Sequence, residues 1–154
     1  MELIFISNFK NEKFISAFKT ALEEFSIDLS KLGTYIEEFN AAGDIYAYVL
    51  LNEKGESIGM IQFQKTVLSN ELLNEEYGLI REFWIAPEHR KQGCGSLLLK
   101  KAESYFVENN LCYSILSSRE EAVDFYRKNG YTKKENARSF NGMIVLEKEL
   151  KHNE

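Results

Sequence analysis

Apolar residues recur with two different periods along this chain of 154 residues, and the periods divide it into helices and strands. From Phe14 to Phe25 they return every three or four positions, which is typical of one buried helix face. The same spacing resumes from Leu29 to Phe39, so a second helix is expected there. Alternating or continuous apolar runs indicate strands instead. We predict strands at Glu2–Ser7, Ile45–Leu51, Ser57–Leu68, Tyr77–Ala86, Leu111–Ser117, Tyr131–Arg138 and Met143–Leu150.

Two more helices are predicted between the later strands, at Gly95–Asn109 and Glu120–Asn129. Gly130 follows the second of these, in the position where glycine commonly ends a helix. Three polar stretches connect the strands. They are the turn at Asn52–Glu56, the acidic loop or helical turn at Ser69–Glu76, and the turn of a terminal hairpin at Ser139–Gly142.

The resulting order, β-α-α-β-β-β-α-β-α-β-β, predicts a mixed α/β fold around one sheet. Three consecutive strands between Ile45 and Ala86 should form an antiparallel meander. The strand–helix–strand unit from Tyr77 to Ser117 should place its two strands parallel through a right-handed crossover. Because no repeat, low-complexity tract or linker interrupts the pattern, we expect a single domain over residues 1–154.

Composition narrows the class of protein. Hydrophobic residues make up 44% and charged residues 28%, as in ordinary globular proteins. The net charge of −5 argues against nucleic acid as a partner. No apolar run is long enough for a membrane helix, and the N-terminus lacks the features of a signal peptide. Cys94 and Cys112 are too few for a disulfide scaffold, and no metal-binding pattern is present. We therefore expect a cytoplasmic protein without metal or membrane partner.

A candidate anion site lies between the strand that ends near Pro87 and the following helix. The sequence there is RKQGCGS, from Arg90 to Ser96. First-turn N–H groups of a helix have no intrahelical partner, and the helix dipole favours negative charge beside them. Gly93 and Gly95 allow a bulky phosphate to approach the backbone closely. Glycine pairs are common, but the preceding arginine, strand and following helix favour a phosphate-bearing ligand over an ordinary surface turn.

On these residues the chain resembles the GNAT superfamily of acyl-CoA-dependent N-acyltransferases. The family pattern R/Q-x-x-G-x-G/A corresponds to Arg90–Gly95, after the strand end Ile85-Ala86-Pro87. A second family pattern, F/L-Y-x-x-x-G-F/Y, corresponds to Phe125–Tyr131. The resemblance covers most of the chain and implies a GNAT-like fold around a central splayed strand. One departure is Arg119, at a position where many members carry an asparagine that orders the pantetheine arm; it could instead reach a phosphate or be solvated.

The resemblance implies acetyl transfer from acetyl-CoA to a primary amine, of a small molecule or a protein, by direct attack in a ternary complex. It places the pyrophosphate on the N–H groups from Lys91 to Ser96, with Arg90 bracing the loop, meeting phosphate or solvated. The pantetheine arm should pair with backbone groups of the preceding strand. Cys94 is interpreted as a small turn residue. The implied cofactor-binding residues are Phe83, Trp84, Ile85, Arg90, Lys91, Gln92, Gly93, Cys94, Gly95, Ser96 and Arg119.

Two side chains are candidates for proton transfer. Tyr126 matches the family's general acid, and a phenol with a reference pKa of about 10 stays protonated at neutral pH; a ring that only packs is the alternative. Glu82 is the preferred base, acting through water. Strand alternation places Glu82 with Trp84 and opposite Phe83 and Ile85. A solvated carboxylate or an ion pair with Arg81 is the alternative role of Glu82, and the alternative bases are Glu37 and Glu38.

Two other classes of protein compete with the enzyme. One is a catalytically silent acyl-CoA-binding sensor or interaction module. The other is a nucleotide-binding protein, which the missing Walker lysine and G-x-G-x-x-G spacing disfavour. No shared pattern identifies the amine acceptor, whose pocket should come from the first two helices, the Ser69–Glu76 loop and the final hairpin. Dimers are common among similar proteins, so a homodimer is a further expectation.

Overall fold

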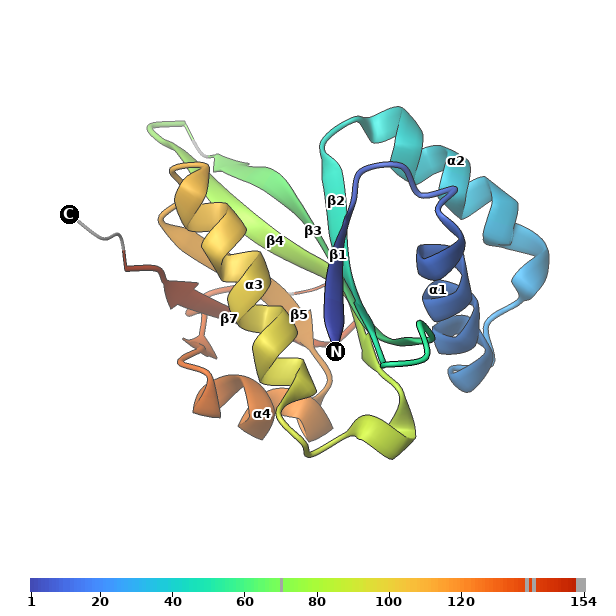
Figure 1. Ribbon diagram of the computed structural model, residues 1–154. Coiled ribbons are helices and arrows are strands. Elements are labelled where there is room, and N and C mark those ends of the chain that lie inside the picture. The colour runs from blue at the N-terminus through green and yellow to red at the C-terminus, as the bar shows by residue number, and fades with distance from the viewer. Residues whose placement is uncertain (70, 138, 140, 152–154) are drawn as a thin grey trace. The chain divides into compact units, whose positions relative to one another are not determined.

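A computed structural model describes residues 1–69, 71–137, 139 and 141–151 of the chain (Figure 1). The order of its helices and strands agrees with the order predicted from the sequence. The helices are α1 (Glu12–Glu24), α2 (Leu32–Ala42), α3 (Cys94–Glu108) and α4 (Val123–Lys128). The strands are β1 (Glu2–Ile6), β2 (Ile45–Leu51), β3 (Ser57–Ser69), β4 (Asn74–Ile85), β5 (Tyr113–Ser118), β6 (Thr132–Lys133) and β7 (Ile144–Glu149).

The described strands form a sheet in the order β1-β2-β3-β4-β5-β7-β6. The pairs β1–β2, β2–β3, β5–β7 and β6–β7 are antiparallel, and β4–β5 is parallel. The predicted parallel pair is therefore confirmed, with Gly78 opposite Ser114 and Leu79 opposite Ile115. Gly78 admits the Phe106 ring of α3, because a Cβ at this glycine would lie only 2.3 Å from that ring. The predicted fold class, a mixed α/β fold around one sheet, is therefore confirmed.

The chain forms two compact units that interleave along the sequence. The first unit contains residues 1–64 and 81–102, and the second contains residues 65–80 and 103–154. Strands β3 and β4 and helix α3 contribute residues to both units. None of the helices in the described part of the chain is long and apolar enough to cross a membrane.

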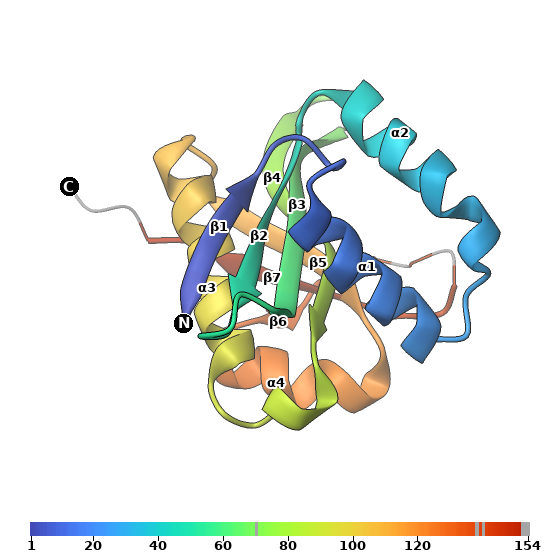
Figure 2. The same ribbon diagram turned by 45° about the vertical axis from the view of Figure 1, so that its right-hand side comes forward.

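In the first unit, β2 and β3 present two different faces. Their register pairs Ala47 with Gln62 and Tyr48 with Ile61, and paired residues point to the same face. Lys101 of α3 lies over the Tyr48 ring at 5.5 Å, so α3 covers the Tyr48 face. Helices α1 and α2 cover the other face (Figure 2), where a cluster of rings fills the core. Its buried members are Phe9, Phe14, Phe18 and Phe39.

The core of the second unit holds a buried polar network beside its apolar residues. The Tyr131 hydroxyl donates to Glu103 Oε2 at 2.9 Å. The Ser114 hydroxyl lies 2.7 Å from the Tyr131 hydroxyl. Lys148 Nζ donates to the other Glu103 oxygen at 2.7 Å. Glu103 lies on α3, Ser114 on β5 and Lys148 on β7, so the network connects these three elements. Burial raises the pKa of Tyr131, which therefore remains a donor.

Several predicted boundaries were wrong. The acidic stretch Ser69–Glu76 is strand at both ends, because β3 runs to Ser69 and β4 begins at Asn74, and residues 71–73 connect the two strands. The Lys65–Glu76 ion pair, at 2.8 Å, shows how charged residues are accommodated on this exposed hairpin. The strand predicted at Tyr131–Arg138 reduces to Thr132–Lys133, and Arg138 itself and residue 140 of the expected turn lie outside the described residues.

Both predicted short helices begin with a tighter turn. Residues Leu29–Lys31 form a 3₁₀ helix before α2, and residues Glu120–Ala122 form another before α4. The Asp28 side chain accepts from the Ser30 N–H and thereby starts the first of these turns. Apolar spacing alone does not distinguish a 3₁₀ start from a regular α-helical one.

Candidate functional site

The loop from β4 to α3 makes two left-handed turns in the backbone. After β4 ends at Ile85, residues Pro87–His89 form a 3₁₀ helix, and α3 begins at Cys94. Between them Lys91 has φ 61° and Gly93 has φ 87°. Non-glycine residues are uncommon in this region, so the conformation of Lys91 is a specific feature of the loop. Together the two residues turn the chain sharply into the start of the helix.

This turn presents backbone N–H groups at the N-terminus of α3. The Leu97 N–H donates to the Gly93 carbonyl at 3.0 Å, and this bond opens the helix. The N–H groups of Cys94, Gly95 and Ser96 precede it and belong to the set that a helix leaves without intrahelical partners. The positive end of the helix dipole lies at the same place. The geometry therefore suits a phosphate group, as the glycine pattern predicted.

Arg90 ties this loop to β4 and to α1. Its Nε donates to the Ile85 carbonyl at 2.9 Å, and its Nη2 donates to Glu24 Oε2 at 2.6 Å. The Trp84 indole N–H also donates to Glu24, at 3.1 Å. The hydrogen bond from Arg90 lowers the pKa of Glu24, against desolvation that raises it. Of the predicted roles for Arg90, these contacts match the bracing of the loop.

The other predicted loop residues divide into exposed and buried groups. Lys91 is exposed, and so is Gln92, whose Nε2 donates to the Glu88 carbonyl at 3.1 Å. Ser96 is half-buried. The Cys94 side chain is 5% exposed, and the residue is the first of α3 instead of the turn residue that was predicted.

Strand β4 breaks the regular alternation of its side chains within the first unit. At one end, Ile85 shares a face with Gly59, because a Cβ at Gly59 would lie 2.8 Å from Ile85 Cδ1 and 3.2 Å from Leu98 Cδ1 of α3. Trp84 points the other way, toward Glu24 of α1. Arg81 should then share the face of Ile85 if the strand were regular.

Arg81 instead points to the face covered by α2. Its Nε donates to Gln62 Oε1 at 3.3 Å, and its guanidinium carbon lies 6.0 Å from the centre of the Phe39 ring. Arg81 and Trp84 thus share a face although they are three residues apart, so the strand contains an irregularity between them. These contacts place Arg81, Trp84 and Ile85, and the predicted position of Glu82 with Trp84 and opposite Phe83 stays a prediction. Irregularities of this kind interrupt the regular ladder of a strand.

Glu82 lies within this irregular stretch. Its side chain is exposed to solvent, yet the surrounding protein desolvates the carboxylate and raises its pKa, while the Arg81 charge lowers it. The guanidinium of Arg81 donates to glutamine oxygens, so it acts on Glu82 through its charge. The alternative bases Glu37 and Glu38 are exposed on α2.

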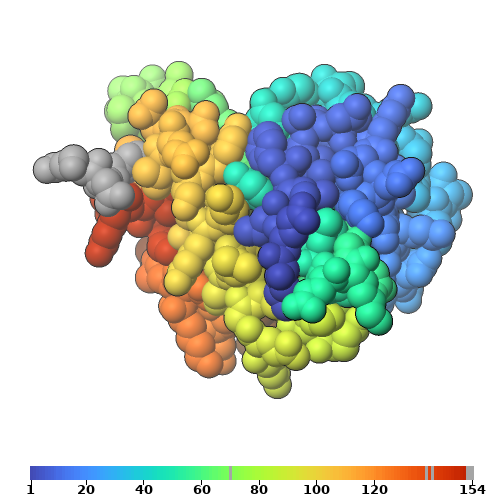
Figure 3. Space-filling model, viewed as in Figure 1, coloured from blue at the N-terminus to red at the C-terminus, as the bar shows by residue number. Residues whose placement is uncertain are grey.

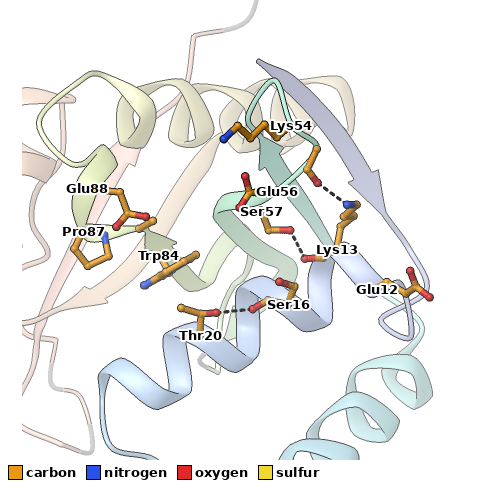
Figure 4. Close-up of a pocket in the computed structure, with 12 residues that line it drawn as sticks. Glu12, Lys13, Ser16, Thr20, Lys54, Glu56, Ser57, Trp84, Pro87 and Glu88 are labelled. Carbon is orange, nitrogen blue, oxygen red and sulfur yellow. Dashed lines mark hydrogen bonds between the residues drawn. The ribbon is translucent and has the colours of Figure 1, made fainter.

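A polar pocket of about 480 Å³ opens in the first unit beside Trp84 (Figure 4). Helix α1, the β2–β3 turn and the β4–α3 loop line it, and Figure 3 shows the green surface of the turn next to the yellow-green surface of the loop. Ser57 Oγ donates to the Lys13 carbonyl at 2.7 Å and holds the turn against the helix. The pocket has acidic and basic residues on its wall, among them Glu12, Lys54 and Glu88.

Tyr126 lies on α4 in the second unit. Its ring is half-buried and packs edge-on against Phe125 and Tyr131, at centroid distances of 5.2 and 5.8 Å. Desolvation raises the pKa of Tyr126 to about 12, so the phenol stays protonated. The helix ends in a Schellman-type turn, with the Tyr131 N–H on the Tyr126 carbonyl at 3.0 Å and Gly130 at φ 95°. The predicted role of Gly130 as the residue that ends the helix is confirmed.

Arg119 is exposed at the start of the 3₁₀ turn that precedes α4. Its carbonyl accepts from the Ala122 N–H at 3.1 Å and from the Ser118 hydroxyl at 2.7 Å. The backbone of Arg119 thus starts the turn. Among the described residues, no group of histidine, cysteine, aspartate or glutamate side chains could hold a metal ion.

Sequence reasoning missed the contacts of three residues: Glu24, Gln62 and Arg81. Gln62 left a signal, since a glutamine interrupts the apolar run of β3, and it is 0% exposed in the structure. Glu24 left none, because it lies 66 residues from its partner Arg90 and looks like any exposed helix residue.

Comparison with known families finds one matching model, described as the acetyltransferase (GNAT) domain, over residues 43–133. The chain is also 29% identical over 59 residues to the uncharacterized N-acetyltransferase YjcF of Bacillus subtilis. That alignment covers 38% of this chain and 42% of the relative, so it spans less than half of either protein.

Solved structures share the fold over nearly the whole chain at low identity. An aminoglycoside 6′-N-acetyltransferase complexed with coenzyme A has a TM-score of 0.76 at 14% identity, with 100% of this chain and 99% of the other covered. A GNAT-family acetyltransferase of Staphylococcus aureus has a TM-score of 0.69 at 17% identity, covering 97% and 100%. PaiA N-acetyltransferase of Thermoplasma acidophilum, in complex with coenzyme A, has 0.62 at 15%, covering 97% and 99%.

Proposed function

The chain belongs to the GNAT acetyltransferase family, and we propose that residues 1–154 form one catalytic domain that transfers an acetyl group from acetyl-CoA to a primary amine. The observation that carries this proposal is the turn formed by Lys91 and Gly93 at the start of α3. A phosphate-bearing donor fits there because three helix N–H groups meet the positive end of the dipole. Two relatives of the same fold were solved with coenzyme A.

The donor-binding residues act mainly through the backbone. We assign the pyrophosphate to the N–H groups from Lys91 to Ser96, with the exposed Lys91 ammonium adding positive charge. We assign the amides of the pantetheine arm to the backbone of residues 83–85, as the family resemblance implies. Acetyl-CoA supplies the acetyl group as a thioester. Arg90 contributes by keeping the loop attached to β4 and α1.

Glu82 is the proposed proton acceptor. An alkylamine has a reference pKa of about 10.4 and arrives mostly as the ammonium form, so it must lose a proton before it attacks. The raised pKa of Glu82 makes this carboxylate a stronger base than an ordinary surface glutamate. Its exposure to solvent is consistent with transfer through a water molecule.

Tyr126 is the proposed hydrogen-bond donor to the leaving sulfur. Its pKa of about 12 exceeds the value of about 8.5 for an ordinary thiol, so complete proton transfer to a free thiolate is uphill. A half-buried phenol that stays protonated can still stabilise the negative charge that develops on sulfur. The contribution of Tyr126 should therefore be that of one well-placed donor.

The test is a screen of primary amines with acetyl-CoA, in which the release of free thiol and the N-acetylated product are both measured. The proposal predicts that thiol and product form in equal amounts with at least one amine. Binding of CoA without product from any amine of the panel, including peptide N-termini and lysine peptides, would identify a silent acyl-CoA-binding module instead. Failure to bind CoA would overturn the donor assignment.

A further inference from the structure

Arg81 projects from β4 with hydrogen-bonding capacity left over. Its Nε donates to Gln62 Oε1 at 3.3 Å and its Nη1 donates to Gln64 Oε1 at 2.8 Å. An arginine carries five N–H donors, and these bonds use two of them. The residue is exposed, and neither of these two bonds uses Nη2. Both partners are uncharged amides, which leaves the positive charge without a direct counter-ion among these contacts.

Three neighbours hold this guanidinium in place. The two glutamines are adjacent on one face of β3, and Gln64 Nε2 in turn donates to Asp44 Oδ1 at 2.8 Å. The Phe39 ring of α2 lies 6.0 Å from the guanidinium carbon. Arg81 is thus oriented by an aromatic face and two amides. An arginine prepared in this way is suited to bidentate recognition of a planar anion.

Gln62 supplies a second, independent observation. Its side chain is 0% exposed, and among the described residues its Nε2 is buried and has no hydrogen-bond partner. Buried amide nitrogens nearly always have a partner, so a missing one indicates a polar group that completes the site. The bond from Arg81 fixes the orientation of this amide, because its oxygen must face the guanidinium. Gln62 thus presents its oxygen to Arg81 and keeps an unpartnered polar nitrogen beside that contact.

We propose that the amine acceptor also carries a carboxylate, which Arg81 binds through its guanidinium group and Gln62 helps to position. This inference rests on the proposed function, because it names the class of acceptor for that reaction. A carboxylate fits better than a phosphate for a reason of charge. The cluster provides one cation, and the Asp44 carboxylate lies one hydrogen bond behind it. Arg81 offers one positive charge to the single charge of a carboxylate, and repulsion from Asp44 disfavours the second charge of a phosphate.

The experiment uses primary amines in matched pairs, each as the free carboxylate and as its amide, for example glycylglycine with glycylglycinamide. We expect kcat/KM to be about tenfold or more higher for the carboxylate members. Arg81→Gln should abolish that preference through the KM of the acceptor and leave the KM of acetyl-CoA unchanged. Lys19→Gln removes an exposed charge from α1 of the same unit and should keep the preference. Equal rates within the pairs, or a preference that survives in Arg81→Gln, overturn the proposal.

The variant Gln62→Leu separates a positioning role of Gln62 from a purely structural one. It removes the buried unpartnered nitrogen together with the oxygen that accepts from Arg81, and because these two effects on stability oppose each other the thermal unfolding temperature should change little, while the carboxylate preference should weaken. Retention of the full preference in this variant contradicts the positioning role of Gln62. O-phosphoethanolamine is tested beside ethanolamine, and an Arg81-dependent preference for the phosphate compound above all carboxylates would overturn the choice of anion.

Direct binding separates this proposal from the proposed function. N-acetylglycylglycine has no free amine and is not a substrate, and its binding can be followed by calorimetry in wild type and Arg81→Gln. If no amine is acetylated but this compound binds in an Arg81-dependent way, acyl transfer fails and the carboxylate site stands. If amines are acetylated and neither binding nor rate depends on Arg81, the carboxylate site fails and acyl transfer stands.

Discussion

Arg90 and Arg81 lie in the same unit, one in the loop after β4 and one within that strand, and their guanidinium groups have different partners. Arg90 pairs with the Glu24 carboxylate and with the Ile85 carbonyl. Arg81 meets two neutral glutamine oxygens, and the residue is exposed. The arginine of the family pattern thus braces the loop before α3, while the arginine outside any pattern is the one that we propose to bind a ligand. A motif residue need not be the one that touches substrate.

The comparison also separates the two halves of the proposed site. The donor side is built from backbone conformation, at Lys91 and Gly93, and is the part that a shared pattern can encode. The acceptor side is built from side chains on α2, β3 and β4, and no pattern is expected to fix it. Substitutions on the two sides should therefore change different kinetic constants.

Glu82→Gln should have the largest effect. Without the proposed base, kcat should fall by about 10²-fold. The raised pKa of Glu82 means that wild-type activity should decline as the pH falls through a value above the ordinary 4.5, since the carboxylate must be deprotonated to act. That limb should be absent from the pH profile of the variant. An unchanged profile would assign the base to another residue, with Glu37→Gln and Glu38→Gln as the next variants.

Tyr126→Phe should come next, with a decrease in kcat of about ten- to 10²-fold and little change in either KM. The ring packing against Phe125 and Tyr131 survives this change, so the unfolding temperature should remain close to that of wild type. Full turnover in the variant, under conditions where the chemical step limits the rate, would leave Tyr126 a packing residue.

Gly93→Ala should weaken binding of the acetyl donor and leave the KM of the amine acceptor unchanged. Space for a Cβ exists, since no atom lies within 4 Å of its position, but φ 87° is costly for any L side chain. The strain should lower the free energy of unfolding by about 1–2 kcal/mol and raise the Kd for CoA by about tenfold as the turn shifts. Gly33→Ala is the matched control, because it also has open space but lies in α2, where alanine favours the helix. A change in acceptor KM without a change in CoA affinity would contradict the division between the two sides.

Glu24→Gln should give the smallest effect. The pKa of Glu24 is lowered in the folded protein, so its ion pair stabilises the fold above the ordinary pKa of 4.5 and loses that effect as the pH falls through the lower folded value. The free energy of unfolding at neutral pH should drop by about 1 kcal/mol. The difference between variant and wild type should shrink toward acid pH, which denaturant titrations at several pH values would show. A difference that is constant with pH would mean that the pair does not brace the loop.

How much of this could be predicted from the sequence depends on how local each signal is. Hydrophobic periodicity gave the order of elements and the parallel β4–β5 pair, and glycine marked the turns at Gly93 and Gly130, because both signals lie within a few neighbouring residues. The irregularity in β4 could not be predicted, since it depends on which elements Arg81 and Trp84 contact. The role of Glu24 was equally hidden, because its partner is 66 residues away.

The central claim, that the start of α3 holds the donor's phosphates, is tested most directly by NMR titration of the ¹⁵N-labelled protein with CoA. The amide resonances of residues Lys91 to Ser96 should show the largest shifts, and Gly93→Ala should reduce them at the same CoA concentration. Large shifts confined to other parts of the chain, with these amides unchanged, would contradict the account.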